Sequence, residues 1–188
     1  MILEKPFLTI DQVYFAKCNQ HSDINEHLPI LKSYAEICEH ITEFGVRSVV
    51  STYAFMAGKP HTIRSYDIEP IENFGIDREY LKFFAFHNGI DFEFNVNDVL
   101  SLTIQQTDLL FIDTLHTYTQ LKKELELHSN SVNKFIILHD TETFGTIGEN
   151  GEIGLWLAVE EFLKKDFNWV LHEKYANNNG LTVLKRVR

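Results

Sequence analysis

Short apolar runs alternate along this chain with stretches of helical periodicity, after a less regular beginning. The apolar runs predict seven strands, one ending near Phe44 and the others over about 62–66, 91–95, 108–112, 134–139, 169–173 and 181–185. Helical spacing of apolar residues predicts helices over about 28–40, 49–57, 76–88, 118–129 and 154–165. The 134–139 run is apolar almost throughout, which is typical of a strand covered on both faces.

This alternation predicts an α/β fold, namely a Rossmann-like, doubly wound mixed sheet of about seven strands with helices on both faces. The last two strands flank Tyr175-Ala-Asn-Asn-Asn-Gly180, and Asn and Gly tolerate the positive φ that tight turns need. We therefore expect the chain to finish in an antiparallel hairpin. Residues 1–188 are expected to form a single domain, with 1–27 as an N-terminal arm or lid.

Composition narrows the class of partner. The 188 residues include 17 basic and 27 acidic side chains, and the net charge of −10 argues against binding a phosphate backbone. The two cysteines have no metal-ligand spacing and no signal peptide is evident, so a reducing cytoplasmic setting is expected. No apolar segment approaches the ~20 residues that a bilayer span needs, so no membrane partner is expected.

Four acidic residues stand at or near the ends of predicted strands: Glu43, Asp67, Asp98 and Asp113. In an open parallel sheet, ligands bind in the crevice at the carboxyl ends of the strands. We therefore expect these carboxylates to gather around one cleft.

The first strand-to-helix turn excludes one ligand class and favours another. It carries Gly45 but lacks the Gly-x-Gly-x-x-Gly pattern, and an acidic residue there would repel a pyrophosphate. S-adenosylmethionine (SAM), with its sulfonium, amino group and ribose hydroxyls, fits better. Asp67 can accept from the ribose hydroxyls and Asp98 from the adenine amino group. Glu43, Gly45 and Ser51 are expected near the amino-acid end.

A second cluster follows the next two strands: Asp113 and His116 after one, His139 and Asp140 after the other. Neighbouring strands lie about 4.8 Å apart, so these side chains can converge. Asp113, His139 and Asp140 could hold Mg²⁺ or another divalent cation. Alternatively, Asp113, His116 and His139 could act in catalysis, with a histidine as general base. A purely structural role stays open, with Asp113 capping the next helix.

Several stretches together resemble class I SAM-dependent methyltransferases, in particular the small group related to macrocin and sugar O-methyltransferases and to cephalosporin hydroxylase-like proteins. The stretches are Ser22–Pro29, Glu43–Arg47, Ser51-Thr52, Ser65–Asp67, Asp108–Tyr118, Ile137–Thr141 and Asn178–Leu184. The resemblance implies a seven-stranded sheet with a final hairpin, SAM as cofactor, and metal-binding acidic residues after the fourth and fifth strands. Val49 departs from the family's second glycine and is expected to narrow the approach to the methionine part of SAM.

These observations predict a SAM-dependent O-methyltransferase acting on a small hydroxylated acceptor such as a sugar or glycoside, with or without help from a divalent metal. Acceptor contacts would come from the N-terminal arm, from residues 141–154, or from a second subunit of a homo-oligomer. One rival is a SAM- or sugar-binding module without turnover. Another is a nucleotide-dependent oxidoreductase, against which the missing glycine pattern speaks.

Overall fold

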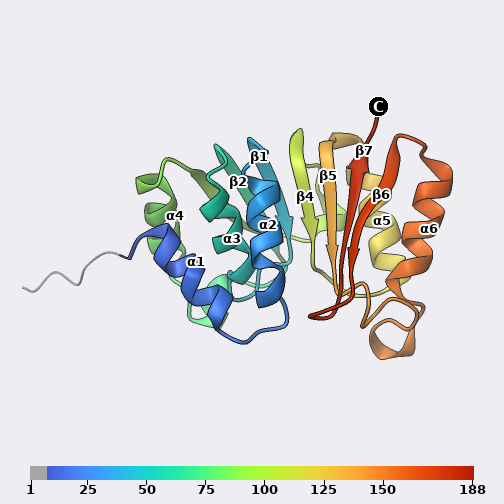
Figure 1. Ribbon diagram of the computed structural model, residues 1–188, viewed down its shortest axis with the longest axis horizontal. Helices are drawn as coiled ribbons and strands as arrows, with labels where there is room; N and C mark the ends of the chain where they lie inside the picture. Colours follow the sequence, from blue (N-terminus) through green and yellow to red (C-terminus); the bar gives the residue numbers. More distant parts are fainter. Residues whose placement is uncertain (1–7) are drawn as a thin grey trace, which may run out of the picture.

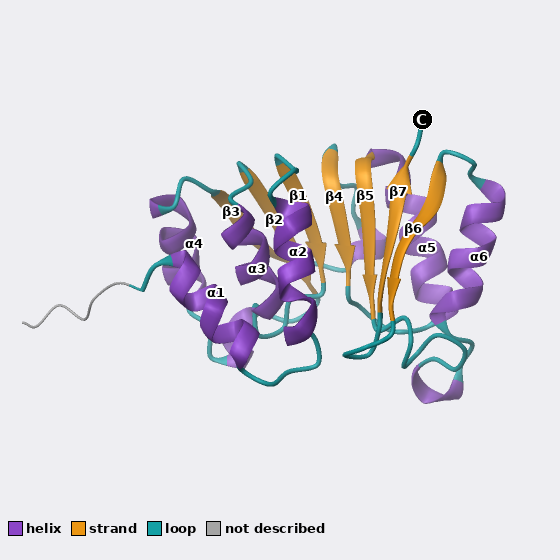
Figure 2. Cartoon of the chain, in the orientation of Figure 1, coloured by secondary structure: helices purple, strands orange, loops and turns teal. Residues whose placement is uncertain are grey.

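The computed structural model describes residues 8–188, which form one seven-stranded sheet with helices against it (Figures 1 and 2). The strands are β1 (His40–Phe44), β2 (Thr62–Asp67), β3 (Asp91–Val96), β4 (Thr107–Ile112), β5 (Val132–His139), β6 (Trp169–Tyr175) and β7 (Leu181–Arg186). The α-helices are α1 (Ile10–Asn19), α2 (Leu28–Ala35), α3 (Val50–Gly58), α4 (Arg78–His87), α5 (Tyr118–His128) and α6 (Leu155–Lys165).

The sheet order is β3-β2-β1-β4-β5-β7-β6. Strands β1 to β5 pair in parallel, and β7 lies antiparallel between β5 and β6. The predicted mixed sheet and its final hairpin are therefore confirmed. The carboxyl ends of the five parallel strands meet along one edge of the sheet, at the bottom of Figure 1.

Two apolar cores lie on opposite faces of the sheet. One is built with residues of α1, α2, α3 and α4, and it includes Ile41, Phe111 and Ile137 from the strands. The other is built with residues of α5 and α6, and it includes Phe44 and Ile136. Odd and even positions of one strand supply different cores because successive strand side chains point to opposite faces.

The beginning of the chain differs from the sequence expectation in its detail. Residues 1–7 of the predicted arm lie outside the described residues. Within the arm, α1 begins at a capping box. The Thr9 side chain accepts from the backbone amide of Gln12, and the Gln12 side chain accepts from the backbone amide of Thr9. Buried Ile10 joins the core of α3, so this part of the arm is packed structure. Helix α2 is shorter than predicted, because the chain turns after Ala35 and enters β1 at His40.

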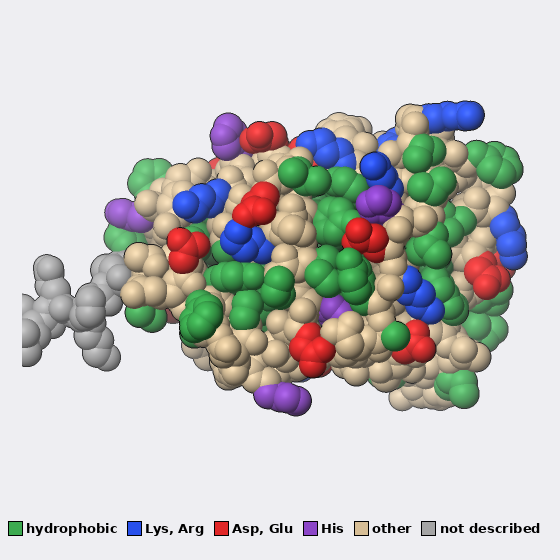
Figure 3. Space-filling model, viewed as in Figure 1, with side chains coloured by type: hydrophobic (Ala, Val, Ile, Leu, Met, Phe, Trp, Pro, Cys, Tyr) green, Lys and Arg blue, Asp and Glu red, His purple; other side chains and the backbone are tan. Residues whose placement is uncertain are grey.

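Surface charge is mixed on the face shown in Figure 3, where Lys and Arg side chains are scattered among acidic and apolar ones. None of the helices within residues 8–188 combines the length and the apolar character that crossing a lipid bilayer requires.

Candidate active site

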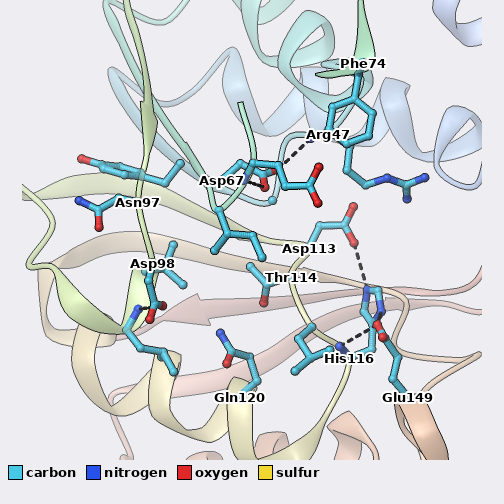
Figure 4. Close-up of a pocket in the computed structure, with 17 residues that line it drawn as sticks. Arg47, Asp67, Phe74, Asn97, Asp98, Asp113, Thr114, His116, Gln120 and Glu149 are labelled. Atoms are coloured by element: carbon cyan, nitrogen blue, oxygen red, sulfur yellow. Dashed lines mark hydrogen bonds and ion pairs between the residues drawn. The ribbon is translucent and has the colours of Figure 1, made fainter. Parts of the chain in front are cut away.

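A cavity of about 620 Å³ opens beside the carboxyl ends of β1, β2 and β4 and the turn after β3. Its volume lies in the range of about 300–1,000 Å³ that is typical of small-molecule sites. In Figure 4, Asp98 and Gln120 lie toward one end, and His116 and Glu149 toward the other. The polar residues that line it are Arg47, Tyr66, Asp67, Glu69, Asn97, Asp98, Asp113, Thr114, His116, Gln120 and Glu149.

Gly45 allows the loops after β1 and β4 to touch at the floor of this cavity. Its φ is 80°, in the left-handed region that favours glycine. A Cβ at this position would lie 1.8 Å from the carbonyl oxygen of Asp113. A side chain here would therefore push the two loops apart.

Asp67 ends β2, lines the cavity and also fastens the turn after β1. Its Oδ2 accepts from the amides of Val46 at 2.8 Å and Arg47 at 3.0 Å, and its Oδ1 accepts from the amide of Glu69 at 3.0 Å. An ionised carboxylate has about four lone-pair sites, so acceptor capacity remains for a ligand. The sequence predicted a ligand-binding role for Asp67 but not its hydrogen bonds to these backbone amides.

Asp98 begins the 3₁₀ turn η3 (Val99–Ser101), and its Oδ1 accepts from the Leu100 amide at 2.9 Å. Nearby, Thr114 Oγ1 and Gln120 Nε2 both donate to Oε1 of buried Glu124, at 2.7 and 2.9 Å. Glu124 thereby orients two side chains of the cavity wall. Because the Gln120 amide nitrogen is engaged, its carbonyl oxygen is the group left to accept from a ligand.

Glu43 and Ser51 lie behind the cavity wall rather than on it. The Glu43 carboxylate is fully buried and accepts from Ser51 Oγ at 2.6 Å, Thr52 Oγ1 at 2.9 Å and Ser65 Oγ at 2.6 Å. Burial raises the pKa of Glu43 to about 7, although these hydrogen bonds oppose the rise. The structure thus gives both residues an internal role and does not bring them to the cavity.

Val49 is also placed away from the cavity. Its side chain is buried in the core of α3, and its φ of 55° is in the left-handed region. That conformation costs a β-branched residue about 1–3 kcal/mol and explains why a glycine would be natural here. Because the side chain points into the core, Val49 is not among the cavity-lining residues.

The predicted second cluster forms at the ends of β4 and β5. Asp113 Oδ1 lies 3.2 Å from His139 Nδ1 and 3.4 Å from His116 Nε2. His116 Nε2 is 2.9 Å from Asp140 Oδ2, and His139 Nδ1 is 3.4 Å from Asp140 Oδ1. Asp113 and His116 line the cavity, whereas His139 and Asp140 are buried behind them. Thr117 caps α5, so the alternative that Asp113 caps this helix is wrong.

Asp140 owes its place in the cluster to its backbone. Consecutive residues of a strand point to opposite faces, so His139 and Asp140 would ordinarily diverge. Asp140 has a φ of 59°, in the left-handed region where Asp is one of the more tolerated residues. This turn at the end of β5 brings both side chains to the same side.

His116 is held by three carboxylates. Besides Asp113 and Asp140, its Nδ1 lies 2.6 Å from Glu149 Oε1, and its ring stacks on Phe144 with centroids 4.7 Å apart. Burial opposes the charged form, but the hydrogen bonds to Asp113 and Asp140 raise the pKa of His116 to about 10. The ring is therefore an imidazolium near neutral pH. This arrangement does not supply the free lone pair that the sequence-based general base requires.

The same cluster also shifts the pKa values of Asp113 and His139. Burial would raise the pKa of Asp113, but hydrogen bonds from His116 and His139 lower it well below its usual range. The pKa of His139 is raised despite its burial, because it faces Asp113 and Asp140.

Three residues of the cluster fit a divalent cation. One ligand atom each from Asp113, His139 and Asp140 lies within 4.8 Å of the others. Asp140 Oδ1 is buried and accepts no hydrogen bond within the described residues. Because one of the three ligands is an imidazole nitrogen, the preference of the site shifts from Mg²⁺ toward Mn²⁺ or Fe²⁺. The two carboxylates keep the site compatible with Mg²⁺.

The lining is strongly acidic. Five of the residues around the cavity are carboxylates, namely Asp67, Glu69, Asp98, Asp113 and Glu149, against Arg47 and His116. Sequence reasoning missed Glu69, Gln120 and Glu149 because each reaches the cavity from a loop or helix with no local signal of its own. Glu149 is the clearest case, since it pairs with His116 across 33 residues of sequence.

Comparison with known proteins gives no match to a family model and no match among curated sequences. Solved structures do match over nearly the whole chain.

A putative caffeoyl-CoA O-methyltransferase from Staphylococcus aureus has a TM-score of 0.64 and 16% identity, covering 96% of this chain and 93% of that one. A putative O-methyltransferase from Klebsiella pneumoniae has a TM-score of 0.62 and 14% identity over 98% and 92%. An O-methyltransferase from Bacillus cereus in complex with S-adenosylhomocysteine (SAH) has a TM-score of 0.61 and 12% identity over 99% and 94%. The chain therefore has the Rossmann-like α/β fold of these methyltransferases, as the sequence predicted.

Proposed function

We propose that this protein is a SAM-dependent O-methyltransferase acting on a small hydroxylated acceptor. The observation that carries the proposal is the sharing of Asp113 between two sites. Asp113 lines the acidic strand-end cavity and also belongs to the acid–histidine cluster of Asp113, His116, His139 and Asp140. A bound nucleoside and a reacting hydroxyl could thus lie on either side of one carboxylate. The O-methyltransferase structures of the same fold, one of them with SAH, support this choice.

The acidic lining suits the charge of SAM. Its sulfonium and ammonium groups are cationic, and five carboxylates around the cavity favour them electrostatically. Asp67 would accept from the ribose hydroxyls through its remaining lone pairs. Asp98 Oδ2 and the Gln120 carbonyl oxygen would accept from the adenine amino group. NAD would instead bring a pyrophosphate into this acidic site, which makes the oxidoreductase alternative electrostatically unfavourable.

The reaction itself is an in-line displacement. The acceptor oxygen forms a bond to the methyl carbon while the carbon–sulfur bond breaks, its electron pair stays on sulfur, and the hydroxyl proton leaves. The protein's main contribution is to hold the oxygen about 3 Å from the methyl carbon. With His116 held as an imidazolium, the ionised carboxylate of Asp113 would accept a hydrogen bond from the acceptor hydroxyl and orient it, and the proton would leave to bulk water as the methyl is transferred.

A divalent cation would be held by Asp113, His139 and Asp140. When bound, such an ion supplies Lewis acidity that lowers the pKa of a hydroxyl near it. The acidic rim would disfavour acceptors that carry phosphate or several carboxylates. A neutral polyol such as a sugar or glycoside is therefore the acceptor class we propose.

The test combines cofactor binding with product detection. Thermal-shift measurements with SAM, SAH and NAD⁺ should show stabilisation by the first two. Incubation with SAM and a panel of sugars and glycosides should give a methylated product detectable by mass spectrometry, with loss in Asp113→Asn. Stabilisation by NAD⁺ alone would contradict the proposal. Stabilisation by SAM with no product from a broad panel would favour the binding module.

A further inference from the structure

The buried imidazole of His27 packs against His139, the most buried histidine of the acid–histidine cluster. His27 is 0% exposed and His139 is 2% exposed, and their rings meet edge to face with centroids 5.7 Å apart. His27 ends the 3₁₀ turn η1 (Asn25–His27), far from His139 in sequence. The cluster and the beginning of the chain are therefore in direct contact.

Both imidazoles bond to consecutive carbonyl groups of the β6–β7 turn. His27 Nε2 lies 2.9 Å from the Asn177 oxygen, and His139 Nε2 lies 3.3 Å from the Asn178 oxygen. A carbonyl oxygen only accepts, so each Nε2 must carry the hydrogen. Nδ1 of His139 is then the nitrogen that faces Asp113 and Asp140, at 3.2 and 3.4 Å.

The turn is held in place by the segment that precedes α2. The Asn178 side chain accepts from the Glu26 amide at 2.9 Å and donates to the Ser22 oxygen at 3.0 Å. Asn177 Nδ2 donates to Glu26 Oε2 at 2.6 Å. Asn178 has a φ of 45°, which Asn tolerates better than most residues. These contacts give the Asn178 carbonyl a fixed direction toward His139.

We propose that His27 and the Asn177–Asn178 turn are positioning residues that present His139 through Nδ1 to a divalent cation shared with Asp113 and Asp140. The proposal rests on the metal-assisted form of the proposed function. Its physical reason is that a ligating imidazole needs its second nitrogen engaged, because this fixes both the ring and the tautomer. His27 acts indirectly, by bonding to the Asn177 carbonyl of the same turn and packing against the His139 ring.

The main test compares His27→Phe with His27→Gln in the full chain. Phenylalanine keeps an aromatic ring but cannot bond to the Asn177 carbonyl. Glutamine places an amide N–H close to the position of the imidazole Nε2 and should restore the bond. Calorimetric titration with Mn²⁺ should show affinity reduced about 10–100-fold in His27→Phe and close to wild type in His27→Gln. Asn178→Gly, which keeps the left-handed turn but removes the two side-chain hydrogen bonds of Asn178 to Glu26 and Ser22, should behave like His27→Phe.

A second readout follows the tautomer of His139 itself. Long-range ¹⁵N–¹H spectra of histidine-labelled, metal-free protein, recorded at a pH high enough for His139 to be neutral, should show a protonated Nε2 and an unprotonated Nδ1 in the wild type and in His27→Gln. Loss of that signature in His27→Phe, in a chain that still unfolds cooperatively, would separate positioning from general destabilisation. A wild-type His139 protonated only on Nδ1 would overturn the inference.

The outcomes separate this inference from the proposed function. If wild-type protein takes up no Mn²⁺, the metal role and this inference fall together, while SAM binding is judged on its own. If the wild type binds Mn²⁺, and His27→Phe and Asn178→Gly bind it equally well with an unchanged His139 spectrum, only this inference falls.

Discussion

The buried carboxylate of Glu43 makes the stability of this protein depend on pH in a way that one substitution should remove. In the folded state the pKa of Glu43 is raised from 4.5 to about 7, chiefly by burial. Between these two values the folded chain binds the proton that the unfolded chain releases. The contribution of Glu43 to the unfolding free energy is therefore fully present below pH 4.5, and this contribution is lost as the pH rises through about 7.

The magnitude follows from the two pKa values. At about 1.4 kcal/mol per pH unit, the interval from 4.5 to about 7 corresponds to about 3 kcal/mol of unfolding free energy. Glutamine has nearly the shape of glutamate and does not ionise. The hydroxyls of Ser51, Thr52 and Ser65 can rotate to donate to its oxygen or accept from its nitrogen. Glu43→Gln should thus match the wild type near pH 4 and exceed its stability by up to about 3 kcal/mol at pH 8.

Urea unfolding followed by tryptophan fluorescence at several pH values measures this difference, since buried Trp169 reports the folded state. The exposed Glu79→Gln is the matched control and should leave the pH profile parallel to that of the wild type. Parallel profiles for Glu43→Gln as well would show that the Glu43 carboxylate is not buried as described. The reasoning from burial to pKa would then be refuted.

Three further predictions concern the cavity. Asp67→Ala should lower the unfolding free energy by about 2 kcal/mol, because three amides lose a charged acceptor, and should weaken SAH binding at least tenfold. Asp67→Asn keeps one acceptor oxygen, so urea unfolding should show a smaller loss of stability than in Asp67→Ala, while calorimetry should still show weakened SAH binding. Gly45→Ala should cost more than about 2 kcal/mol and abolish SAH binding, since its Cβ would meet the Asp113 carbonyl in a left-handed conformation; normal stability would contradict the described loop contact. Asp113→Asn should eliminate Mn²⁺ uptake while SAH binding persists, and unchanged uptake would place the metal elsewhere.

The sheet could be predicted from the sequence because period-2 runs and their turn residues are local signals. The same was not true of α1, where one fully buried residue, Ile10, gives too weak an apolar stripe to mark a helix. The end of α2 was misjudged because helical spacing continued to Cys38, which is buried in a turn after the helix has ended.

For the site, the sequence identified the strand-end acids but not the direction of each side chain. Glu43 turns inward because hydroxyls from α3 and β2 surround it, and those contacts are non-local. Asp140 joins the cluster because its own backbone is left-handed, and the sequence around it carries no signal that predicts this conformation. Glu149 and His27 reach the cluster from segments far away along the chain, and only the folded structure brings them there.

Calorimetric titration of the wild-type chain with SAH tests the central claim most directly, namely that the acidic strand-end cavity binds the SAM nucleoside. We predict binding of one SAH per chain, weakened by Asp67→Asn and Asp98→Asn, and no heat with NAD⁺. Binding of NAD⁺ in place of SAH, or SAH binding that is unaffected by both substitutions, would contradict the account.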